Sequence, residues 1–139
     1  MKVVLTITGS QRFGTDEPEK TSLVTEGTLE REGDILLLSY EESELTGMEG
    51  TTTVFRVEPA RITLQRSGTL ESQMVFELGH EDRSLYDMGF GALMITVCAD
   101  TIRSDMSETG GTLDVTYSIV IEQAAAGSVH YRITARPKE

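Results

Sequence analysis

Apolar and polar residues alternate in short segments along most of the chain, and this period of two constrains the fold more than any other feature. In the first such segment Val3, Leu5 and Ile7 fall on one face and threonines on the other. The expected strands are residues 3–9, 21–30, 35–40, 51–57, 61–66, 70–78, 92–102, 113–121 and 129–135, with a short one at Leu85 and Tyr86 in the otherwise irregular stretch 80–91.

The connections between these segments carry turn-forming residues. Residues 31–34, Arg-Glu-Gly-Asp, predict a tight hairpin in which Gly33 takes a positive φ. Pro59 marks the next corner, because proline presets φ and cannot donate to a ladder. Residues 104–111 have capping-box spacing, but no apolar periodic run follows, so we predict a hairpin loop there. The polar stretch 11–20 is expected to be a mobile loop.

Eight to ten strands with no helix long enough to cover an open sheet predict that the sheet covers itself. The fold class is therefore all-β, a closed antiparallel up-and-down barrel, which leaves no exposed strand edge. A chain of 139 residues is expected to form one domain over 1–139. A barrel of about eight strands has an interior that side chains fill or that holds one small ligand.

The charge balance excludes some partners. Twelve Lys and Arg stand against 23 Asp and Glu, a formal net charge of −11. Such a surface repels phosphate backbones and anionic headgroups, so we expect no nucleic-acid and no membrane partner. The apolar run near the N-terminus is shorter than a signal-peptide core. Cys98, as the single cysteine, allows no intrachain disulfide. These features predict a cytoplasmic protein.

Six segments have an order and spacing typical of one known family: SYEESELTG (39–47), TTTVFRVE (51–58), LQRSG (64–68), MVFELG (74–79), YDMGFGALMITV (86–97) and GGTLDVTYSI (110–119). The chain resembles, over residues 35–121, the YwiB-like family of small bacterial proteins. The resemblance implies a calycin-like β-barrel, similar in architecture to lipocalins, and a cytoplasmic location. It supplies no catalytic residues, and Cys98 stands where the family pattern usually has a hydroxyl residue.

Few residues have the spacing that catalysis or metal binding requires. The histidines, His80 and His130, lie far apart in sequence, and a metal site would need them joined by carboxylates such as Glu77 or Asp87. We expect two surface imidazoles and no metal. The nearest charged neighbour of Cys98 in sequence is acidic, which favours a structural thiol. No nucleophile elbow, phosphate loop or dinucleotide motif is present, so no cofactor is expected.

Arg66 is the most informative polar residue. It follows Ile62 and Leu64 on the same strand parity, which aims its guanidinium at the apolar side of the sheet. Buried arginine is costly unless it is paired. Two interpretations follow: Arg66 reaches the rim or closes an internal salt bridge, or it binds an anionic group of a ligand at the barrel mouth. The residues expected around it are Tyr40, Glu41, Tyr86, Asp87 and Tyr117.

Three functions are consistent with these features. The leading hypothesis is a non-enzymatic barrel that binds a small, partly apolar or anionic molecule near Arg66, Tyr40, Tyr86, Tyr117 and Glu41. The alternative is a structural or protein-interaction module with a packed barrel that acts as a homodimer, because residues 35–38 are apolar on both faces. The third is an enzyme whose site combines Glu, His80 or Tyr side chains in a cleft.

Overall fold

Each strand expected from the alternation is present, and most are longer than expected. The computed structural model describes residues 1–13, 17–43, 49–69, 71–87, 91–122 and 125–138, with the backbone alone at 13, 86, 87, 125 and 126. Within these ranges the strands are β1 Lys2–Phe13, β2 Glu19–Glu32, β3 Ile35–Glu41, β4 Thr51–Val57, β5 Ile62–Gly68, β6 Ser72–Phe76, β7 Glu81–Asp87, β8 Ala92–Ser104, β9 Gly111–Ile121 and β10 Ala125–Pro137. None of the described residues belongs to a helix long and apolar enough to cross a membrane.

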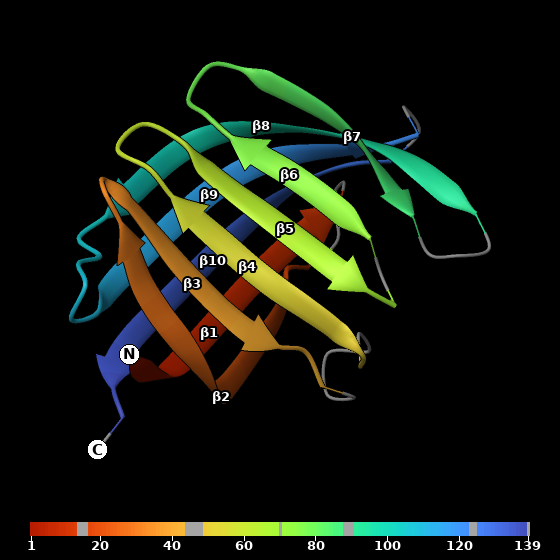
Figure 1. The fold of residues 1–139 in the computed structure, drawn as a ribbon. Helices are drawn as coiled ribbons and strands as arrows, with labels where there is room; N and C mark the ends of the chain where they lie inside the picture. The colour runs from red at the N-terminus through yellow and green to blue at the C-terminus, as the bar shows by residue number, and fades with distance from the viewer. Residues whose placement is uncertain (14–16, 44–48, 70, 88–90, 123–124, 139) are drawn as a thin grey trace.

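The strands form one antiparallel sheet in meander order. The spatial order is β6-β5-β4-β3-β2-β1-β10-β9-β8-β7, so the first strand pairs with both the second and the last. Figure 1 shows this pairing as red and blue ribbons running side by side. The predicted up-and-down connectivity is therefore confirmed.

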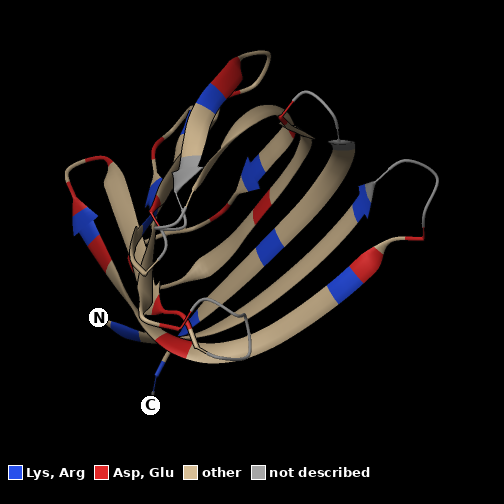
Figure 2. Cartoon of the chain, turned by 90° about the vertical axis from the view of Figure 1, so that its right-hand side faces the viewer, with Lys and Arg blue, Asp and Glu red and all other residues tan. Residues whose placement is uncertain are grey.

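The two edges of the sheet, β6 and β7, meet and nearly close a barrel. No continuous ladder joins them in the described residues; instead the Val75 amide donates to Oδ2 of Asp82 at 3.0 Å, and Leu78 forms an isolated bridge with Ala99. The Asp82 carboxylate therefore satisfies the edge amide of Val75 at a point where the backbone ladder stops. Figure 2 shows the sheet curving back on itself, with many acidic residues toward strand ends and turns.

The turns test the local predictions. Gly33 has φ 61° in the two-residue connection of β2 and β3, which confirms its expected role. The expectation of a mobile loop over residues 11–20 is wrong for much of that stretch, because Gln11 pairs with Glu19 in the β1–β2 ladder. Backbone hydrogen bonds extend this hairpin although its side chains are polar on both faces.

The inward-facing side chains of β3–β6 form three rows across the sheet. The row nearest one end is Leu36, Val57, Ile62 and Phe76; the next is Leu38, Phe55, Leu64 and Met74; the third is Tyr40, Thr53, Arg66 and Ser72. We call the third the polar row. The change from apolar to polar takes one step of two residues along each strand, which places a polar cluster directly against the core.

Candidate functional site

The polar row holds buried donors without partners. Arg66 is half-buried, and its Nε atom has no hydrogen-bond partner; the same is true of the hydroxyl oxygens of Thr53 and Ser72, all within the described part of the chain. Arg66 faces the lumen, as its parity predicts. An unpaired buried donor costs about 1–3 kcal/mol, so these three neighbouring atoms are a costly feature of the interior.

Arg66 also lines a cavity at one end of the barrel. The cavity has a volume of about 420 Å³, within the range of small-molecule sites. Its apolar wall consists of Met74, Leu93, Ile95, Ile119, Ile121 and Val129. Arg66, Tyr117 and Tyr131 add polar groups, and Arg66 is the one cation among the described lining residues. We call this end, where β8 begins and β9 stops, the open end.

Two tyrosine hydroxyls meet beside Arg66. The hydroxyl oxygens of Tyr40 and Tyr131 lie 3.3 Å apart, and the Tyr131 ring packs on Phe55 with 5.7 Å between centroids. Burial raises the pKa of Tyr40 well above its ordinary value, and the neighbouring Tyr131 and Glu42 raise it further. Burial also raises the pKa of Tyr131, although the charge of Arg66 opposes this. Both phenols therefore stay protonated and can donate hydrogen bonds.

The carboxylate of this cluster is Glu42 rather than Glu41. Glu41 was expected beside Arg66, but its side chain is exposed on the outer face and accepts the Thr52 hydroxyl at 2.9 and 3.1 Å. Glu42 is only 6% exposed and interacts with Tyr40. The reason is the period of two: Tyr40 faces inward, so the next inward position is two residues on.

The other predicted tyrosines have different outcomes. Tyr117 is 8% exposed, lines the cavity and stacks on Phe76 with 4.6 Å between ring centroids. The backbone of Tyr86 pairs with Leu93, while its side chain, like that of Asp87, lies outside the described residues. The structure thus brings Arg66 and Tyr117 to one cavity, with Tyr40 connected through Tyr131.

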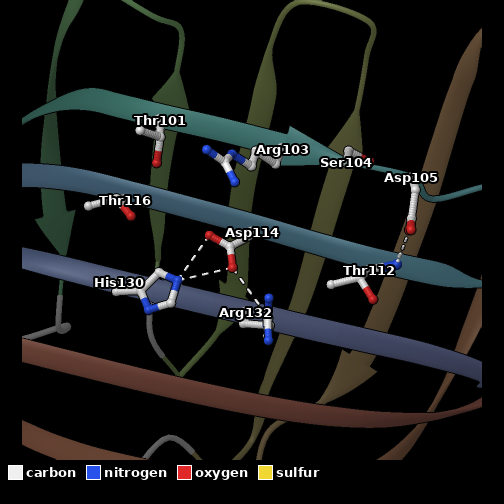
Figure 3. A pocket seen from close by; sticks show the side chains of 9 residues that line it. All are labelled: Thr101, Arg103, Ser104, Asp105, Thr112, Asp114, Thr116, His130 and Arg132. Atoms are coloured by element: carbon white, nitrogen blue, oxygen red, sulfur yellow. Dashed lines mark hydrogen bonds and ion pairs between the residues drawn. The ribbon is translucent and has the colours of Figure 1, made fainter.

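A second hollow lies on the outer face of β8–β10 and has a volume of about 530 Å³ (Figure 3). Asp114 is its centre: His130 Nε2 lies 2.9 and 3.0 Å from the two carboxylate oxygens, and Arg132 Nε donates to Oδ2 at 3.1 Å. Arg103 is the cross-strand neighbour of Asp114. Exposed ion pairs of this kind contribute about 0–1 kcal/mol each, so the cluster is mainly a feature of the solvated surface.

The remaining predicted chemistry is dispersed. His80 is exposed in the β6–β7 connection, at the end of β6 opposite Ser72, and its amide donates to the Glu77 carbonyl at 3.1 Å. Cys98 is a half-buried free thiol. Among the described residues no group of three His, Cys, Asp or Glu side chains is placed to hold a metal ion. His80 therefore does not join the carboxylate and tyrosines of the lumen.

Sequence reasoning missed four polar residues of the lumen around Arg66: Glu42, Thr53, Ser72 and Tyr131. Each had the same signal that identified Arg66, a polar group on the parity of apolar neighbours. Thr53 shares parity with Phe55, and Ser72 with Met74. Only strand order brings these positions together, because the cluster spans β3–β6 and β10.

The family model described as "Domain of unknown function (DUF1934)" matches residues 5–133. The chain belongs to this family. The "Uncharacterized beta-barrel protein YwiB" of Bacillus subtilis (strain 168), a relative of this DUF1934 chain, is 26% identical over 89 residues. That match covers 64% of the chain and 61%, less than two thirds, of the relative's length. The crystal structure of the ywiB protein from Bacillus subtilis superposes with a TM-score of 0.83 at 19% identity, covering 98% of this DUF1934 chain and 92% of that one. The family resemblance and the β-barrel are confirmed.

Proposed function

We propose that the protein is a non-enzymatic binding barrel whose open-end cavity takes a small, partly apolar molecule with an anionic group at Arg66. The observation that carries this proposal is a half-buried guanidinium that makes no hydrogen bond or ion pair with another described residue and lines a largely apolar cavity. A cation in this setting is stabilised by an opposite charge brought in by a ligand.

The wall of the cavity supports an apolar ligand body. Ile95 and Ile119 are 4% and 8% exposed, and Gly9 presents no side chain above Tyr131: a Cβ there would lie 3.8 Å from Cδ2 of the Tyr131 ring. Glycine on an inward position leaves space that a larger residue would fill. Up-and-down barrels that carry ligands in the lumen also combine an open end with an apolar cavity wall. The proposal is calycin-like in this respect.

Native mass spectrometry of the protein purified from its own host, compared with its denatured mass, tests this function. The expected result is a retained small molecule that is lost on denaturation. Arg66→Ala should retain much less of it, and the exposed outer-face variant Arg103→Ala should retain as much as the wild type. Bare wild-type protein in every preparation contradicts the proposal.

We also propose that the protein is located in the cytoplasm. Its support is Cys98, a half-buried free thiol and the single cysteine of the sequence, which suits a reducing compartment. A membrane-impermeant maleimide should label Cys98 after cell lysis and denaturation but not in intact cells. Labelling in intact cells contradicts this location.

A second candidate function is interaction through the outer surface as a homodimer. It is favoured by a directly paired Leu85 and Met94, which are 58% and 40% exposed on the β7–β8 hairpin. Ile35 and Leu37, which prompted the prediction, are only half-exposed. Sedimentation of the wild type at high micromolar concentration should show a dimer that Leu85→Lys dissociates; a monomer excludes this function.

A further inference from the structure

Three unpaired donors of the lumen lie on consecutive strands. Thr53 is the direct cross-strand partner of Arg66, and Arg66 is the direct partner of Ser72. Side chains directly opposite each other on one face have Cβ atoms about 4.5–5.5 Å apart. The side chains of Thr53 and Ser72 therefore lie on either side of the base of the Arg66 side chain, and none of the three buried atoms has a hydrogen-bond partner among the described residues.

We propose that this donor row recognises one carboxylate group, so that the barrel selects monocarboxylates with an apolar tail. The inference rests on the proposed function and specifies its ligand class. Arg66 lines the cavity and supplies the positive charge, and the neighbouring hydroxyls of Thr53 and Ser72 are further donors for a carboxylate that comes close to it.

Glu42 disfavours a more highly charged head group. Its side chain is 6% exposed and raises the pKa of both Tyr40 and Tyr131, and the charge of Arg66 also acts on Tyr131. A phosphate monoester carries about −1.5 to −2 charges at neutral pH, more than one guanidinium neutralises, and like charges at short range repel. The barrel should therefore reject phosphate monoesters that carry the same tail.

The two tyrosines complete the donor set. Their hydroxyls remain protonated because burial raises the pKa of Tyr40 and of Tyr131. They can donate hydrogen bonds without adding charge. In contrast, Glu19 at the rim of the cavity carries a negative charge, and Gln11 Nε2 lies 3.5 Å from its carboxylate. Among the described lining residues, Arg66 is therefore the one group whose charge attracts an anion, and Glu19 at the rim opposes it.

Calorimetric titration of the full chain with four eight-carbon probes tests the ligand class. The probes are octanoate, octyl phosphate, 1-octanol and octylamine, whose unbranched alkyl tails differ by at most one carbon and whose head groups differ in charge and shape. We expect octanoate to bind at least tenfold more tightly than each of the others. Arg66→Gln should abolish the octanoate-over-octanol preference, and Thr53→Val and Ser72→Ala should each reduce it severalfold. Arg103→Gln on the outer face should leave it unchanged.

The outcomes separate this inference from the proposed function. Octyl phosphate binding as tightly as octanoate overturns carboxylate selection but leaves an anion-binding cavity. Equal binding of octanol and octanoate overturns any role of Arg66 in recognition but leaves an apolar cavity. Binding of none of the probes, together with bare protein in the native mass spectrum, overturns both. Arg66→Lys provides a second variant that keeps the charge and lacks the Nε donor, and it too should lose most of the preference.

Discussion

The two ends of the barrel lumen differ although the same alternation builds both. Away from the open end the interior is filled, and we call this part the closed end. Its largest buried side chains, 0–1% exposed, include Leu5, Leu29, Leu38, Leu113 and Ile133. At the open end the inward positions include Gly9, Thr21 and Arg66, and the apolar residues around them enclose a cavity. Inward orientation is therefore common to both ends, while side-chain size and polarity decide whether the interior becomes a core or a site.

Truncating one leucine at each end measures this difference most directly. Leu38→Ala should lower the free energy of unfolding by about 3 kcal/mol, because it leaves a void in a filled interior. Leu93→Ala at the open end should cost about 1 kcal/mol, since its side chain already borders empty space. Urea denaturation of both variants provides the measurement. Equal losses would mean that the two ends are packed alike.

Filling the cavity with a larger side chain should make the open end resemble the packed closed end. A Cβ on Gly9 would lie 3.2 Å from the Thr21 hydroxyl oxygen and 3.8 Å from the Tyr131 ring, so Gly9→Val projects methyl groups into the cavity. We expect octanoate affinity to fall about tenfold, equivalent to about 1.4 kcal/mol, and the Thr21 side chain to shift to make room. The neighbouring outward-facing variant Thr8→Val serves as the control. Undiminished binding in Gly9→Val would place the ligand elsewhere.

The buried tyrosines make the open end sensitive to alkali. The pKa of Tyr40 is raised above 10.0, its value in the unfolded chain, so the folded state keeps the proton at pH values where the unfolded state loses it. The stabilisation is complete below about pH 10 and is lost as pH rises beyond it. Tyr40→Phe should flatten this alkaline decline, at a loss near neutral pH of about 1 kcal/mol for the hydrogen bond. Denaturation midpoints from pH 7 to 11 test the slope; identical slopes would exclude Tyr40 as its source.

The outer face should show the smallest effect. Asp114→Asn removes the carboxylate that His130 and Arg132 share, yet both basic side chains are about half-exposed. We expect a change below about 0.5 kcal/mol that disappears at high salt. Thermal melts at two ionic strengths measure it. A loss comparable to that of Leu38→Ala would show that this cluster contributes to the fold.

Much of the fold could be predicted because its physical cause is local. The regular parity of Leu93, Ile95 and Val97 identifies β8, and Gly33 identifies the tight turn after β2. The errors occurred where the side-chain signal is weak: the β1–β2 hairpin continues through polar residues because its backbone ladder continues. Parity identifies Arg66 as an inward residue, whereas the prediction of Glu41 did not follow from parity, since the period of two places Glu42 on the inner face with Tyr40.

The sequence by itself determined most of the side chains that face the lumen, since a regular strand sends successive residues to opposite faces; the exception is the register shift between Ala99 and Thr101 in β8. It also determined that the sheet had to cover itself, because no helix was available. Only the tertiary structure decided that Thr53, Arg66 and Ser72 stand side by side, and that Tyr131 of β10 meets Tyr40 of β3. Register and closure place residues distant in sequence next to each other, and these depend on the pairing of whole strands around the barrel rather than on any local pattern.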